Sequence, residues 1–93
     1  MTILQRSKTQ GSTSFATCGD GSHQLFHINP GVPAVAALEY AAMLQECVNQ
    51  ALLEVVEGDA RPASLWPALY MGEMARAIID DLTVPSSPVP GVD

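Results

Sequence analysis

Four side chains with metal-binding atoms lie in the first half of the 93-residue chain, namely Cys18, His23, His27 and Cys47. Cysteine thiolates and histidine nitrogens are the usual ligands of structural zinc. The spacing argues against a site, because an extended segment would place His23 and His27 about 13 Å apart. The familiar Cys-x2-Cys pair is also missing. We therefore expect two surface histidines and two unrelated thiols. The alternative is a small metal-binding or thiol-dependent protein that uses these four residues.

Catalysis by a thiol or by paired carboxylates would need a partner that the sequence does not supply. Cys18 lies in a glycine-rich turn with no adjoining cation to activate it. Cys47 falls at the edge of an apolar helical stripe and is predicted to be a small core residue. Asp80 and Asp81 are predicted to lie on a solvated helix face, at the end where the helix dipole disfavours negative charge. We therefore expect no enzymatic activity and no cofactor.

The charge balance limits the classes of partner. Ten acidic residues stand against four basic ones, and residues 31–93 alone carry nine acids against Arg61 and Arg76. Such a surface disfavours binding to nucleic acid, which requires basic side chains. An acidic decoy of a nucleic-acid-binding partner is a further alternative, because Glu39, Glu46 and Glu57 share one helix face. With no membrane span and no signal peptide in the sequence, we expect a cytoplasmic protein without membrane contact.

Two segments have the alternating three- and four-residue spacing of apolar side chains that amphipathic helices require. The first runs from Pro33 to Glu57, before a helix-stopping Gly58. The second begins near Ser64, the predicted N-cap, and ends near Leu82. The first apolar seam is Ala34, Ala37, Ala41, Leu44, Val48, Ala51 and Val55, and the second is Ala68, Met71, Ala75, Ile78 and Leu82. The short loop between them predicts antiparallel neighbours.

The remaining segments lack helical periodicity. Residues 1–17 are predicted to be a disordered N-terminal arm, and the proline-rich residues 84–93 a disordered tail. Residues 23–28 favour a short extended segment, which must pair with a second copy or lie on the helices. The predicted fold is all-α, with a helical hairpin domain over residues 18–83.

Apolar residues outside the two seams predict a second buried surface. Trp66 and Tyr70 are one helical turn apart, so their rings can form one surface. Gly72, in the middle of the second helix, would let a partner approach closely. The predicted interaction surface is Trp66, Leu69, Tyr70, Met43, Leu53 and Phe26. We expect a homodimeric four-helix bundle; alternatively, Phe26, Ile28 and the N-terminal arm fold over this patch. The predicted function is a non-catalytic protein–protein interaction or regulatory module with an unknown protein partner.

Two blocks of the sequence resemble a family of small bacterial proteins, known mainly from pseudomonads and catalogued as a domain of unknown function. They are Cys18-Gly19-x-Gly21-x-x-x-Leu25-Phe26-x-Ile28-Asn29-x-Gly31-Val32-Pro33-x-x-x-Ala37-Leu38-x-x-Ala41 and Tyr70-Met71-Gly72-Glu73-Met74-Ala75-Arg76-Ala77-Ile78-Ile79-Asp80-Asp81. The resemblance implies that both blocks belong to one domain. It implies no activity, cofactor or catalytic residue. The chain departs from the family at Pro67 and in its proline-rich tail.

Overall fold

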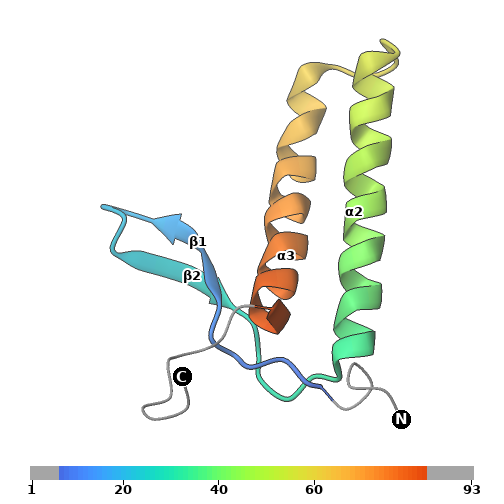
Figure 1. The fold of residues 1–93 in the computed structure, drawn as a ribbon. Helices are drawn as coiled ribbons and strands as arrows, with labels where there is room; N and C mark the ends of the chain where they lie inside the picture. Colours follow the sequence, from blue (N-terminus) through green and yellow to red (C-terminus); the bar gives the residue numbers. More distant parts are fainter. Residues whose placement is uncertain (1–6, 84–93) are drawn as a thin grey trace, which may run out of the picture.

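Two antiparallel helices packed side by side form the body of the protein, and a two-stranded hairpin lies beside the end of the second helix (Figure 1). The computed structural model describes residues 7–83. The elements in chain order are β1 (Ser14–Cys18), β2 (His23–His27), α2 (Ala34–Val56), the 3-10 turn η1 (Pro62–Ser64) and α3 (Leu65–Thr83). The predicted helical hairpin is therefore confirmed. The proline-rich tail predicted over residues 84–93 lies outside the described residues.

The contact between α2 and α3 is made largely of small side chains. Both predicted seams face each other: Ala41, Leu44 and Ala75 form the centre of the core, and Met71 and Ile78 pack against them. Within residues 7–83, all the buried apolar residues except Leu44 are alanines. A core of this kind is thin, so the other sides of both helices stay open to solvent.

The helix ends agree with the sequence except at Ser64. Gly58 has a φ of +83°, a conformation in which glycine avoids a steric cost, and its amide donates to the carbonyl of Val55 at 3.1 Å. The prediction that Ser64 is the N-cap of the second helix is wrong. It belongs to η1, where its own amide donates to the carbonyl of Arg61 at 2.9 Å, and α3 follows directly at Leu65.

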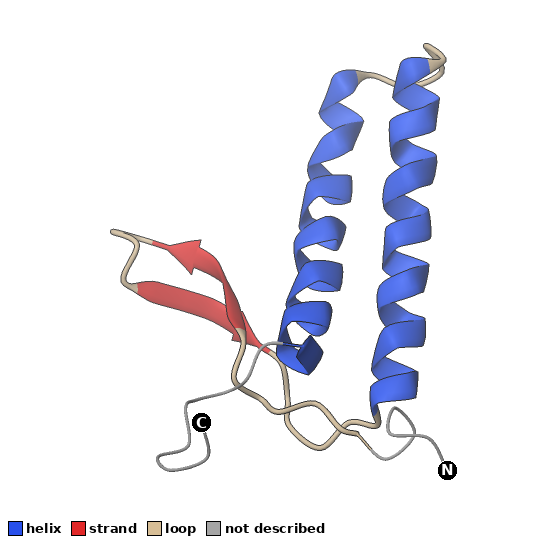
Figure 2. Ribbon diagram, viewed as in Figure 1, coloured by secondary structure: helices blue, strands red, loops and turns tan. Residues whose placement is uncertain are grey.

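The prediction of a disordered arm is wrong for the part of it that the structure describes, residues 7–17. Residues 14–18 form β1, which pairs in antiparallel register with β2, so that Phe15 lies opposite Phe26. The extended segment at residues 23–27 thus finds its partner in its own chain, rather than in a second copy. The strands run outward from the end of α3 (Figure 2). β1 packs against α3 and buries Ala77, but leaves Phe26 half exposed.

Candidate interaction site

The four candidate metal ligands of the alternative hypothesis are not brought together. Cys18 and His23 are cross-strand partners at the turn of the hairpin, whereas His27 pairs with Ser14 at the other end of the strands. Cys47 is an exposed residue of α2. Among residues 7–83, no three His, Cys, Asp or Glu side chains are grouped so that they could hold a metal ion.

The two thiols are both exposed, which corrects the prediction that Cys47 is a core residue. The side of α2 that faces α3 is occupied by Ala41, Leu44 and Val48, and Cys47 lies outside that seam. The thiol of Cys18 donates a hydrogen bond to the carbonyl oxygen of Ala16 at 3.3 Å. Neither cysteine lies in an enclosed site.

Asp81 is the side chain that sequence reasoning misplaced most. It was predicted to lie on a solvated face, yet it is fully buried. Its Oδ2 accepts the backbone N–H groups of Gln10 at 2.6 Å and Gly11 at 3.2 Å. Its Oδ1 accepts those of Ser12 at 2.8 Å and Thr13 at 3.0 Å. Converging backbone N–H groups of this kind form a cradle for an anion.

The charge of Asp81 is favoured in this cradle. Burial raises the pKa of the Asp81 carboxyl, but the backbone hydrogen bonds from Gly11, Gln10, Ser12 and Thr13 outweigh it and hold the pKa below its ordinary value. The side-chain amide of Gln10 also donates to the backbone carbonyl of Asp81 at 2.6 Å. Both oxygens of the carboxylate are therefore engaged in holding the chain, which makes Asp81 a structural residue.

We call residues 7–13 the strap, because they cross the end of the helix pair. Thr9, which is buried, ties the strap to the turn before α2: its hydroxyl donates to the carbonyl of Asn29 at 2.6 Å and accepts the amide of Val32 at 2.9 Å. The amide of Ala34, the first residue of α2, donates to the carbonyl of Ser7 at 2.8 Å. The strap therefore joins the start of α2 to the last turn of α3.

Beside the core, both helices carry a second stripe at the same three- and four-residue spacing. On α2 it comprises Leu38, Ala42, Gln45, Asn49, Leu52 and Val56, and on α3 Leu65, Leu69, Gly72, Arg76, Ile79 and Thr83. We call these twelve positions together the bare face. The two stripes meet on one side of the helix pair at a common groove, which is lined by Leu52 of the α2 stripe and by Leu65, Leu69, Gly72 and Arg76 of the α3 stripe.

The groove in the bare face is apolar. It has a volume of about 420 Å³, and Gly72 leaves room in it between Leu52, which is 45% exposed, and Leu69, which is 52% exposed. The twelve positions of the bare face include no carboxylate, although the chain has ten acidic residues and one of them, Glu73, lies at the rim of the groove. Gln45 and Asn49, its amide side chains, hydrogen-bond to each other at 3.2 Å. An exposed apolar surface of this kind is typical of a binding site.

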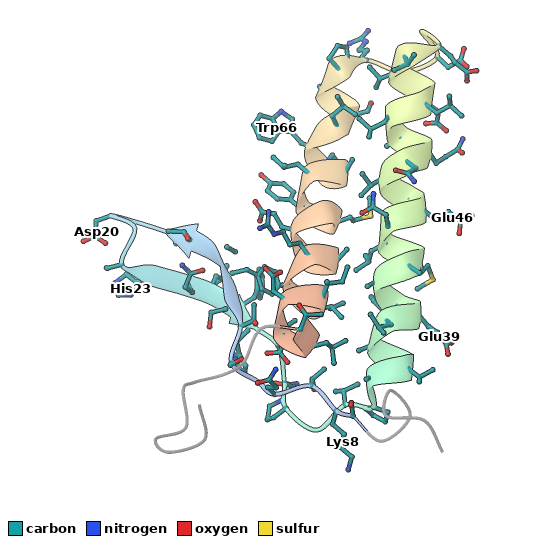
Figure 3. The ribbon with its side chains drawn as sticks, viewed as in Figure 1. Lys8, Asp20, His23, Glu39, Glu46 and Trp66 are labelled. Atoms are coloured by element: carbon teal, nitrogen blue, oxygen red, sulfur yellow. The ribbon has the colours of Figure 1, made fainter. Side chains whose placement is uncertain are left out.

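The predicted interaction surface is divided among several places. Leu69 lies on the bare face. Trp66 projects from the side of α3 turned away from α2 (Figure 3), and its ring centre is 6.4 Å from that of Tyr70. Tyr70 and Phe26 line a separate cleft of about 860 Å³ between the hairpin and α3.

Met43 and Leu53 are exposed on α2. Met43 and Leu52 are nine positions apart, and at a rotation of 100° per residue they lie on opposite sides of α2. The residues named from the sequence therefore do not form one surface. The second stripe, beginning at Leu38 and Leu65, is the signal that would have found the bare face.

Comparison with known proteins adds a family but no activity. A family model described as "Protein of unknown function (DUF3077)" matches residues 9–84. The match includes most of the strap, from Thr9 onward, as well as Asp81. No curated protein and no solved structure matches the chain. Within residues 7–83, neither helix has the length and apolar character needed to cross a membrane.

Proposed function

Because the chain belongs to the DUF3077 family, whose description names no activity, we propose a role from its surface: it is a non-catalytic protein–protein interaction module that binds through the bare face. The observation that carries this proposal is the apolar groove between α2 and α3. A stable monomer gains nothing from keeping Leu52 and Leu69 in water. Burying apolar surface against a partner gains about 25 cal/mol per Å².

The chemistry of the other candidate residues supports a binding role. Asp81, the buried carboxylate of the described chain, is engaged by four backbone amides and holds the strap. Cys18 and Cys47 are separated on the hairpin and α2, and both are exposed.

An acidic decoy fits the surface less well than a module that binds through apolar contacts. Glu39 and Glu46 project from the side of α2 turned away from α3 (Figure 3). Seven residues of helix separate them by about 10 Å along the axis. Successive phosphates along nucleic acid are closer and more numerous than these carboxylates. The face that they form is therefore too sparsely charged to mimic a phosphate backbone.

The test is a site-specific photocrosslink in the living cell. A benzophenone amino acid replaces Leu69 on the bare face, or Glu46 on the far side of α2 as the matched control. We expect the probe at position 69 to give a discrete covalent adduct with a protein, and the probe at position 46 to give none. If both positions gave no adduct, or gave the same diffuse set, the proposed function would be wrong.

A further inference from the structure

We infer that the partner seated on the bare face is a second copy of this chain, so that two helix pairs form a four-helix bundle about a twofold axis. This inference rests on the proposed function and names the partner at the same surface. In such a bundle each helix has two neighbours and needs two apolar stripes. α2 and α3 each carry the seam that faces the other helix and a second stripe on the bare face. The second stripe has apolar residues at its ends, Leu38, Leu52 and Val56 on α2 and Leu65, Leu69 and Ile79 on α3, and polar or small residues between them.

Charge singles out this face for self-association. Each copy carries a formal net charge of −6, so two copies repel each other wherever carboxylates meet. The bare face has no carboxylate among its twelve positions. The acidic side chains of α2, among them Glu39 and Glu46, lie on other sides of the helix. A second copy that approaches here meets no carboxylate within the twelve positions, and Glu73 lies at the rim of the groove.

The basic side chain at the edge of the bare face supports the same pairing. Arg76 is the only Lys or Arg of α2 and α3. It makes a 3.5 Å ion pair with Asp80, but its side chain is still 83% exposed. In a twofold arrangement each contact occurs twice, so the Arg76 of each copy can meet an acidic side chain of the other. Glu73, which lines the same groove, is one such group on α3.

The size of the face suits a dimer. α3 has 19 residues and is therefore about 28 Å long, and two helices side by side are about 20 Å wide. The projected area is roughly 560 Å², which is of the same order as the ~800 Å² of accessible surface per partner that stable complexes bury. The hollow at Gly72 would receive an apolar side chain of the facing helix, as a knob enters a hole.

The test is sedimentation equilibrium of the full chain over a range of concentrations. We expect the wild type to sediment at twice 9.8 kDa. Leu52→Glu and Leu69→Glu would each place a carboxylate on the bare face and weaken the dimer at least about 100-fold. Met43→Glu is the matched control, because Met43 is 52% exposed on the opposite side of α2 and its variant should remain dimeric. Circular dichroism would verify that every variant keeps its helices.

A wild type that stays monomeric at every concentration would overturn the dimer. So would dissociation by Met43→Glu with no effect of the Leu52 and Leu69 variants. The photocrosslink separates this failure from that of the proposed function. An adduct at position 69 containing two copies of the chain supports the dimer. An adduct with a different protein keeps the interaction module and overturns the second copy as its partner.

Discussion

The carboxylate of Asp81 accepts the backbone amide of Gln10 at 2.6 Å, across 71 positions of the chain. This contact joins the last turn of α3 to a segment that has no helix or strand of its own. The cradle is completed by the amides of the next three residues, Gly11 to Thr13. Hydrogen bonds to a buried charge are the strong class of such contacts, so this small site holds the strap and anchors the hairpin that follows it.

Replacing Asp81 with Asn is expected to destabilise the protein by about 2–4 kcal/mol, because the amide keeps one acceptor oxygen and turns an N–H group toward the backbone amides. Urea unfolding followed by circular dichroism would measure the loss. The neighbouring Asp80→Asn is the control: Asp80 makes only an exposed ion pair with Arg76, and its loss should cost within about 0.5 kcal/mol. Equal effects of the two variants would contradict the assigned role of Asp81.

Stability should depend on pH through the same carboxyl. Burial raises the pKa of Asp81, the four amides more than offset this, and the pKa in the folded state lies below the ordinary value. Its contribution is therefore complete above the unfolded pKa of about 4, and it is lost as the pH falls through the folded value. The stability gap between wild type and Asp81→Asn should be constant from about pH 7 to 5 and narrow below about 4. A gap that persists unchanged to pH 3 would be inconsistent with this linkage.

Gly11 is expected to tolerate no side chain. Its φ is +79°, and an added Cβ would lie 2.8 Å from Cδ of Pro30, closer than van der Waals contact allows. Gly11→Ala should therefore cost about 2–4 kcal/mol, from the left-handed backbone together with the clash. Gly31→Ala is the comparison, because Gly31 has a similar φ of +85° but nothing within 4 Å of the added atom. Gly31→Ala should cost only about 1–2 kcal/mol. Thermal unfolding of the two variants would measure the difference.

Gly72→Ala should act in two opposite directions. In the helix of a single chain the added methyl group meets only Cγ2 of Val48, at an ordinary 3.9 Å. Removing a helical glycine then stabilises the fold by about 0.5–1 kcal/mol. The same methyl group fills the hollow of the bare face and should weaken association of two copies. Thermal unfolding at low concentration and sedimentation equilibrium would read the two effects separately; unchanged association would argue against a close approach at Gly72.

The two helices follow from local physics, and the sequence predicts their bounds to within one or two residues. The seam from Ala34 to Val55 has a single spacing that fits only a helix, and Gly58 supplies the stop in a conformation suited to glycine. Ser64 was misplaced because the turn that precedes α3 begins at Pro62, two residues earlier. These features depend on neighbours along the chain, which is why the pattern reveals them.

The strap follows no such local rule. Its residues are polar and aperiodic, and they are held by Asp81, whose distance along the chain hides the connection. A signal was present on α3: Asp81 shares a side of the helix with Met74, Ala77 and Ile78, where a lone carboxylate needs a partner. The bare face is hard to predict for a different reason: its regular spacing is interrupted by Gln45, Asn49 and Arg76, so its apolar residues look like single exposed side chains.

The separation of Gln10 from Asp81 also sets an order of events during protein synthesis. Gln10 is made 71 residues before the carboxylate that holds it, which at 5–20 residues per second is an interval of about 4–14 s. During that interval the hairpin of β1 and β2 has no anchor on α3, and a two-stranded hairpin alone is marginal in water. The N-terminal third of this fold must therefore wait on the nascent chain until the last turn of α3 leaves the ribosome.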